Sequence, residues 1–282
     1  MNYINRIIKI CMLNFRKWSS DYRIWTIGIL LVILTHESIR DLALIGEKLG
    51  VRSTIWYFPF LYCQYHMKLI FTLPLLVLFC NAPFTDRNTL FIISRSGKQK
   101  WLSGQLLYIV LSAAAYYGFI LLFTVILSLP YAEFTADWGK LISTLAYTET
   151  AASMGYYFIE VPANVLTYFT PLQAICFTFL LSWLTAILIG MIICSLNILT
   201  GTKYIGTAVS GIIIVFSCFI AASGKNGLVR FSPSSWNTLN NIDVGGLTCF
   251  PDFYYCVTVC IAVSLALAGL CLISKKNENL FM

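Results

Sequence analysis

The chain has 282 residues, of which 59% are hydrophobic and only 11% are charged. A soluble domain is about 45–50% apolar and about 25% charged, so this composition excludes a soluble globular enzyme. It also excludes a disordered chain, because disorder requires low hydrophobicity. An aromatic content of 15% and a mean hydropathy of +0.78 are typical of a membrane protein with Trp and Tyr at the bilayer interfaces.

Residues 1–18 predict a basic amphipathic helix. At about 100° per residue, one side of the helix collects the apolar residues Ile4, Ile7, Ile8, Cys11, Phe15 and Trp18, and the other side collects the cations. The four cations that define the polar face are Arg6, Lys9, Arg16 and Lys17. We expect the helix to lie in the membrane interface with these cations toward anionic headgroups. A simple anchor for the first span and a gating element are both compatible with this pattern.

Six segments are apolar and long enough to cross a bilayer, which takes about 20 residues. They cover residues 24–45, 56–80, 101–129, 165–196, 204–222 and 253–274. The first is the weakest, because His36, Glu37, Arg40 and Asp41 follow only twelve clean residues. Its helix is expected to continue, with these polar groups at the outer interface or facing protein. The fold class predicted is an all-α polytopic membrane protein, with residues 1–282 as a single transmembrane domain.

The cations indicate the orientation of the spans. Six spans place both termini on one side, and twelve of the nineteen Lys and Arg residues fall on that side. These twelve are Arg6, Lys9, Arg16, Lys17, Arg23, Arg87, Arg95, Lys98, Lys100, Lys203, Lys275 and Lys276. Because cytoplasmic loops are enriched in Lys and Arg, both termini are predicted to be cytoplasmic.

The loop between the second and third spans has an unusual composition. A short helix is expected around Leu90–Ile93, followed by a turn at residues 94–97. An apolar patch flanked by cations suits docking into a groove of a soluble partner. An interfacial turn that only orients the spans is equally compatible with the composition.

Two outer segments, residues 131–164 and 223–252, are long. The second is expected to fold back into the outer leaflet, which requires burial against protein. Trp56, Trp138 and Trp236 are placed as outer-interface aromatics, and a disulfide between Cys249 and Cys256 is left open.

The motifs of catalysis are missing from the sequence. It contains no Walker A, HExxH or GxSxG motif and no Cys/His pattern of a metal site. We therefore expect no enzymatic activity and no metal. Polar residues within spans are functional candidates by default, which selects Gln64, His66 and Lys68 as pathway residues. Pairing of Lys68 within the bundle is the alternative. The scarcity of membrane Asp and Glu counts against proton-coupled transport.

The order of these elements resembles the six-helix permease subunits of bacterial ABC exporters, the class related to the eukaryotic ABCG transporters. The matching features are the amphipathic helix at residues 1–18, two spans, the cytoplasmic loop at residues 81–100, a third span, the long outer segment at residues 223–252 and a short basic tail. The resemblance rests on this layout over the whole chain and not on a sharp motif. The polar stretch at residues 36–41 and the long segment at residues 131–164 depart from it.

The resemblance implies an ABC transporter permease that pairs with a second copy or a paralogue, chiefly through spans one, two and five. Each permease docks a separate ATPase subunit, which binds ATP and Mg, so this chain itself needs no cofactor. Residues 84–97 match the coupling helix of the family. The ATPase contacts implied are Asp86, Arg87, Phe91, Arg95 and Lys98.

The expected location is the bacterial cell membrane. A cargo that is amphipathic or hydrophobic suits an interior with so few charges, and peptide export of a cytolytic toxin or bacteriocin is the first choice. Exporters of phenol-soluble-modulin-like toxin peptides are an example of such a system. Lipid or drug export by the same machinery, a secondary transporter and a membrane enzyme or signalling anchor are the alternatives. Nucleic acid is not an expected partner.

Overall fold

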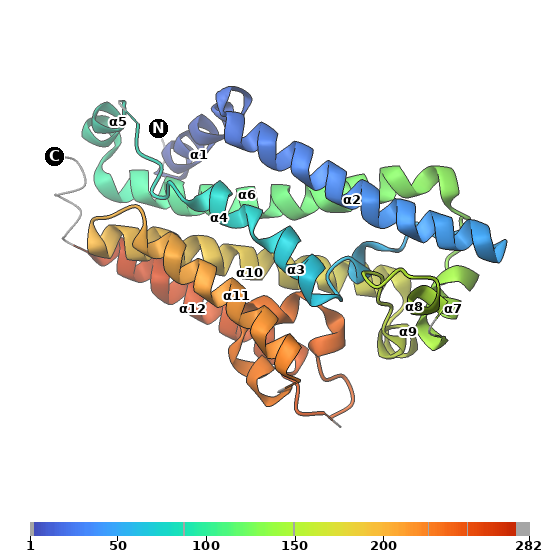
Figure 1. Ribbon diagram of the computed structural model, residues 1–282. Coiled ribbons are helices and arrows are strands. Elements are labelled where there is room, and N and C mark those ends of the chain that lie inside the picture. Colours follow the sequence, from blue (N-terminus) through green and yellow to red (C-terminus); the bar gives the residue numbers. More distant parts are fainter. Residues whose placement is uncertain (1–2, 87, 149, 225, 247, 275–282) are drawn as a thin grey trace.

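The computed structural model of the protein describes residues 3–86, 88–148, 150–224, 226–246 and 248–274. Within these ranges the chain forms α-helices and short 3-10 helices, and no β-strand. The elongated bundle that they build is shown in Figure 1. Its long elements are α2 (Tyr22–Leu49), α3 (Tyr65–Thr72) with α4 (Pro74–Phe79), α6 (Lys98–Ser128), α10 (Pro171–Thr200), α11 (Ile205–Ser223) and α12 (Phe253–Ile273).

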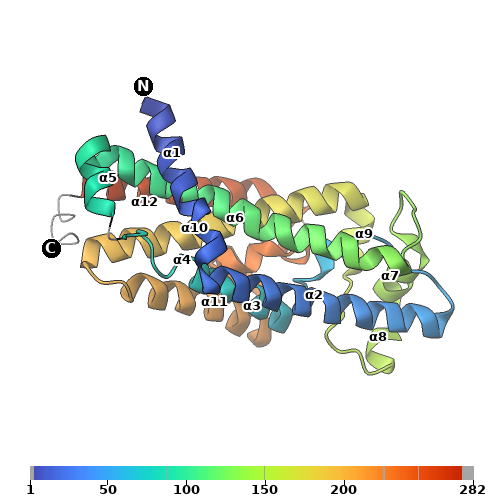
Figure 2. The ribbon, with the colours of Figure 1, turned by 90° about the horizontal axis from the view of Figure 1, so that it is seen from above.

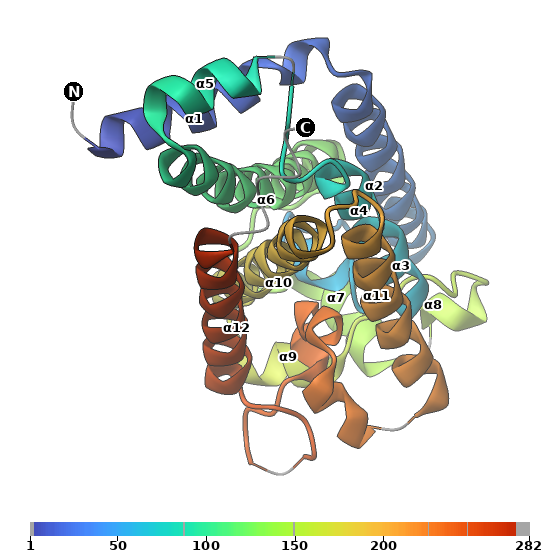
Figure 3. The same ribbon diagram turned by 90° about the vertical axis from the view of Figure 1, so that its left-hand side faces the viewer.

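The core of the bundle is α10, which packs against α4, α6, α11 and α12. Figure 3 looks down the bundle and shows α10 between α6, α11 and α12. Nearly two thirds of its side chains are buried, among them Ile187, Ile189 and Ile193. At Gly190 the helix approaches α6 closely, because a Cβ there would lie 2.5 Å from the Cγ2 atom of Ile109.

Among the described residues, four helices are long and apolar enough to cross a membrane: α6 with its 3-10 extension η3 (Leu129–Tyr131), α10, α11 and α12. The chain is therefore a membrane protein with an all-helical architecture. The remaining two expected spans differ from this pattern. The α2 helix carries charged residues in its second half, and the α3–α4 pair covers only Tyr65–Phe79.

The range 56–80, expected as one span, begins with a non-helical turn. Residues 56–64 contain the 3-10 helix η2 (Phe58–Phe60), and Tyr57, Phe58 and Tyr62 are almost fully buried. Pro59 cannot donate a backbone hydrogen bond, and the neighbouring rings fill the space between α6 and α10, so the regular helix starts only at Tyr65. Lys68 consequently lies in the first turn of α3 and not at mid-span.

The α2 helix continues past its polar stretch. Its 28 residues give a length of about 42 Å, well beyond a hydrocarbon core of about 30 Å. Glu37 is exposed and pairs with His36 at 3.8 Å and with Arg40 at 3.4 Å. Gly50, at φ 66°, ends the helix in the left-handed conformation that glycine adopts without strain.

The two ends of the bundle differ in character. We call "the basic end" the end that holds α1 (Tyr3–Arg16), the 3-10 helix η1 (Trp18–Ser20), residues 80–98 with α5 (Thr89–Ser96), and the α10–α11 turn at residues 200–204. Figure 2 shows α1 crossing over α6 at this end. The opposite end is capped by α7 (Gly139–Tyr147), α8 (Thr150–Ser153), α9 (Ala163–Tyr168) and the 3-10 helices η4 (Asn226–Phe231), η5 (Pro233–Asn237) and η6 (Leu239–Asn241).

The cap at the opposite end is held by its tryptophans, in a way that differs from the expected interfacial role. Trp138 and Trp236 are buried, and their indole N–H groups donate to the carbonyls of Phe169 at 3.0 Å and Val229 at 2.8 Å. Residues 233–237 fold back against α10 and α11. These rings therefore fix the cap to the bundle. In the same region, Cys249 and Cys256 are free thiols.

The close approach at Gly190 generates a stability prediction. Gly190→Ala should lower the stability of the purified protein by about 1–3 kcal/mol, because the added methyl overpacks against Ile109 and the ring of Phe79. Thermal unfolding in detergent measures it. Gly118→Ala on α6 is the control, since no atom lies within 4 Å of its Cβ position. Equal unfolding midpoints for the two variants would contradict the packing.

Candidate docking surface at the basic end

The most distinctive surface of the basic end is the short helix α5. Leu90 is 56% exposed and Phe91 is 69% exposed, and Arg95 is exposed one turn further on. On the other side of α5, Ile92 and Ile93 pack against the core of the protein. The helix thus presents an apolar pair and a cation away from the bundle while its inner face holds it in place.

The local sequence explains why α5 forms where it does. The backbone N–H of Asp86 donates to the Thr89 hydroxyl at 2.7 Å, and the N–H of Thr89 donates to the Asp86 carbonyl at 3.0 Å. This reciprocal turn starts the helix. Gly97, at φ 84°, ends α5 and begins α6 at once. A single glycine therefore separates α5 from the 31-residue α6.

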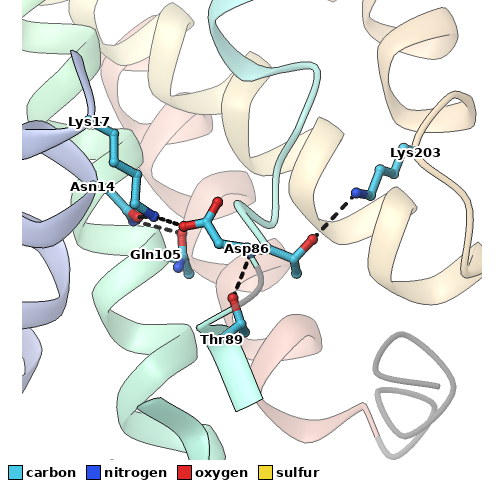
Figure 4. Close-up of polar contacts among 7 residues, drawn as sticks. Asn14, Lys17, Asp86, Thr89, Gln105 and Lys203 are labelled. Carbon is cyan, nitrogen blue, oxygen red and sulfur yellow. Dashed lines mark hydrogen bonds and ion pairs between the residues drawn. The ribbon is translucent and has the colours of Figure 1, made fainter. Parts of the chain in front are cut away.

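Side-chain contacts connect this loop to α1 (Figure 4). The Asp86 carboxylate forms an ion pair with Lys17, which also donates to Asn14 Oδ1 at 3.2 Å. Asn14 in turn donates to Gln105 Oε1 on α6 at 2.9 Å, in a buried hydrogen bond. The ion pair itself is half-exposed, so its contribution to stability is about 0–1 kcal/mol. The buried amide pair is the stronger constraint.

Aromatic rings fill the space beneath these polar contacts. Tyr108 of α6 accepts a hydrogen bond from the Trp18 indole at 2.7 Å. The rings of Phe15 and Phe84 lie edge-on to Tyr108, with centroids 5.0 and 4.8 Å away. Aromatic pairs of this geometry contribute about 0.5–1.5 kcal/mol beyond area burial. Tyr108 is therefore the point where α1, the loop and α6 meet.

A second connection leads from the loop to α10 and α11. Asn197 of α10 donates to the Ala82 carbonyl at 2.7 Å, and its Oδ1 accepts the Gly206 N–H of α11 at 3.0 Å. A Cβ at Gly206 would lie 2.4 Å from the Ile193 carbonyl oxygen, so this crossing needs glycine. One fully buried amide thus connects three segments of the chain.

The expected ATPase contacts fall into two groups. Phe91 and Arg95 are exposed on α5, and Lys98 is partly exposed at the start of α6. Asp86 is exposed as well, but its carboxylate is occupied by Lys17. Arg87 lies outside the described residues. The structure therefore brings Phe91 and Arg95 to one outward surface and uses Asp86 to join the loop to α1.

The amphipathic helix has two apolar faces in the structure. Ile10, Cys11 and Asn14 are buried against α6, whereas Ile4 and Ile8 stay exposed. The cations Lys9, Arg16 and Lys17 are exposed, and Arg6 is partly exposed. The helix packs on protein with one side and leaves an apolar row free with another.

The three pathway candidates do not face the same way. Gln64 occupies the N-cap position of α3, about one helical turn before Lys68, and makes no side-chain capping hydrogen bond. His66 is exposed, and its ring lies against the ring of Tyr65. Lys68 is only 3% exposed and lies near Glu160 of the cap. Burial raises the pKa of the Glu160 carboxyl, and the charge of Lys68 opposes that rise. The opposite end thus places a buried cation beneath its cap.

Sequence reasoning missed Asn14, Gln105, Tyr108 and Asn197. A usable signal exists for the three amides, because a lone amide on an apolar helix face usually hydrogen-bonds across to another segment. Among the described residues, no three His, Cys, Asp or Glu side chains gather closely enough to hold a metal ion.

Comparisons of the chain with protein-family models, with curated proteins and with solved structures give no match.

The buried amide pair generates a prediction. Asn14→Ala leaves the Gln105 amide without its partner, which costs about 1–3 kcal/mol and should release α1 from α6. Tryptic cleavage at the α1 cations of the full chain in detergent measures the release and should accelerate. Asn5→Ala, on the exposed side of α1, is the control. The double variant Asn14→Ala/Gln105→Leu should cleave more slowly than Asn14→Ala. Cleavage of Asn14→Ala at the wild-type rate would refute the constraint.

Proposed function

We propose that the chain is the permease subunit of an ATP-driven exporter, which docks a separate ATPase subunit through α5. The observation that carries the proposal is the arrangement of α5. Leu90, Phe91 and Arg95 point away from the bundle, although the helix itself is fixed to it through Ile92 and Ile93. A short amphipathic helix of this kind fits a groove on a soluble partner, in the manner of other helix-in-groove contacts.

The contacts behind α5 supply a mechanism for coupling. ATP and Mg would bind in the partner ATPase, and closure of the ATPase pair would push α5. The Asp86–Lys17 and Asn14–Gln105 contacts would pass that displacement to α1 and α6, and Asn197 would pass it to α10 and α11. Rigid-body movement of packed helices about an interface is a common form of such switching. This chain would perform no covalent chemistry.

Charge supports the proposed orientation. The basic end holds Arg6, Lys9, Arg16 and Lys17 on α1 and further cations on residues 95–100. Cytoplasmic segments are enriched in Lys and Arg, so the proposal places this end, with both termini, in the cytoplasm of a bacterial cell. The ATPase would then meet α5 on the side where ATP is available.

Exposed apolar rows support pairing with a second permease copy or a paralogue. Ile212, Val215 and Phe219 of α11 are each more than half exposed. Lipid solvates these exposed residues as well as it solvates other apolar residues, so the hydrophobic effect does not drive two subunits together. Close packing between the subunits is what would favour their contact. The helices α10, α11 and α12 contain no charged residue, which suits an amphipathic or hydrophobic cargo such as a cytolytic peptide.

Substitutions at Phe91 and Arg95, which are both exposed on α5, test the proposal. The tagged full chain, isolated from membranes of its own organism, should co-purify with a subunit that carries a Walker A sequence and hydrolyses ATP. Phe91→Asp and Arg95→Glu should each reduce that yield at least ten-fold, because they disrupt the apolar and the charged part of the contact.

Phe134→Ala is the matched control, since Phe134 is 75% exposed at the opposite end of the bundle. It should leave the yield of the ATPase unchanged. An ATPase retained in full by both α5 variants would contradict docking through α5. The absence of any ATPase from the wild-type preparation would contradict the exporter and favour a secondary transporter.

A further inference from the structure

We propose that the basic end holds an anionic phospholipid, with its phosphate among Arg23, Lys17 and Lys203 and an acyl chain in the groove between α2 and α6. The proposal does not depend on the exporter assignment, because it rests on two adjoining cavities of this chain. One is polar and basic, and the other is apolar and opens at the side of the bundle.

The polar cavity has a volume of about 160 Å³ and lies between α1, the start of α2, the end of α4 and the loop before α5. Three cations and two carboxylates, Asp21 and Asp86, line it. Asp86 is already paired with Lys17, and Asp21 accepts the backbone N–H of Arg23 at the start of α2. Among the described residues, the side chains of Arg23 and Lys203 therefore have no carboxylate in an ion pair with them, whereas Lys17 does.

In the part of the chain that the structure describes, the side chains of Arg23 and Lys203 hydrogen-bond only to neutral side chains, and Arg23 feels the charge of Asp21 at a longer distance. Arg23 donates to the Cys80 sulfur at 3.4 Å and lies over the Tyr22 ring, and Lys203 donates to the Thr85 hydroxyl at 3.4 Å. No described carboxylate lies within 4.0 Å of either cation. Guanidinium and ammonium groups that have no carboxylate in contact can donate charge-assisted hydrogen bonds to a phosphate.

The adjoining apolar cavity indicates that the anion carries an acyl chain. It has a volume of about 590 Å³ and shares Trp18, Ile24 and Leu78 with the polar cavity. Its walls are apolar residues of α2 and α6, and sites for small ligands have about 300–1,000 Å³. A free phosphate would leave this groove unused, whereas a phospholipid fills both cavities at once.

The two cavities lie at the membrane depth where lipid headgroups are expected. Trp25 and Tyr22 are 61% and 73% exposed beside them, and such aromatics concentrate at the level of the headgroups. The groove is open laterally, because Ile29 and Ile33 on its rim are also more than half exposed. A lipid of the adjacent leaflet can therefore slide in without crossing the bundle.

Native mass spectrometry of the full chain in detergent tests the proposal, with phosphatidylglycerol and phosphatidylcholine as probes. The wild type should retain phosphatidylglycerol in preference to phosphatidylcholine. Arg23→Gln/Lys203→Gln should lower that preference by about five-fold for each cation removed. The control Lys48→Gln/Arg52→Gln removes two cations at the opposite end and should preserve it.

A groove variant separates a lipid from a free phosphate. At Gly28 the nearest atom to an added Cβ is Cζ of Phe119 at 4.0 Å, so Gly28→Leu fills the groove without disturbing the polar cavity. It should abolish preferential retention of phosphatidylglycerol, and millimolar inorganic phosphate should not displace the lipid from the wild type.

Three outcomes would overturn the proposal. They are equal retention of the two lipids by the wild type, displacement of phosphatidylglycerol by inorganic phosphate, and unchanged preference in Gly28→Leu. The wild-type comparison alone suffices if a variant fails to fold.

Discussion

The first helix reaches the bundle only because residue 104 carries no side chain. A Cβ at Gly104 would lie 2.6 Å from Cγ2 of Ile10, so α1 packs this closely on α6 only because residue 104 is glycine. Directly beside this contact, Asn14 and Gln105 pair at 2.9 Å in a buried site, where an unpaired amide would be costly. Lys17 and Trp18 follow directly after α1 and connect to Asp86 and Tyr108. The shape of the basic end depends on this one close approach.

The lipid environment explains the rest of the architecture. In hydrocarbon every backbone polar group needs an internal partner, so irregular backbone survives only where protein covers it. Residues 56–64 satisfy this condition, because Tyr57, Phe58 and Tyr62 are buried between α6 and α10. The fold-back at residues 233–237 does so too, with Trp236 bonded to the Val229 carbonyl. Both irregular segments lie toward the capped end.

The all-helical character predicted from composition and hydropathy is confirmed for the described residues, and four of their helices are long and apolar enough to cross a membrane, whereas six full spans are not confirmed. The run 56–80 could not be divided from sequence, because a buried aromatic turn and an apolar helix have similar hydrophobicity. Local signals predicted the helix over Leu90–Ile93, which the structure has, but the turn expected at residues 94–97 was wrong for 94–96, because α5 continues through Ser96 and ends only at Gly97. The partners of Asp86 and Asn14 are 69 and 91 residues away in sequence, so no local pattern could indicate them.

In the coupling mechanism proposed above, α1, η1 and α5 move together as one unit. Spin-label distances test this most directly. Nitroxides attached to unnatural amino acids at Ser19 and Ser94 would report the separation of α5 from η1, and a label pair at Ser94 in two subunits would report the motion of α5. The account predicts that ATP binding to the assembled complex shifts the distance between the two subunits and leaves the Ser19–Ser94 distance unchanged. A change in the Ser19–Ser94 distance with the subunits unmoved would contradict it.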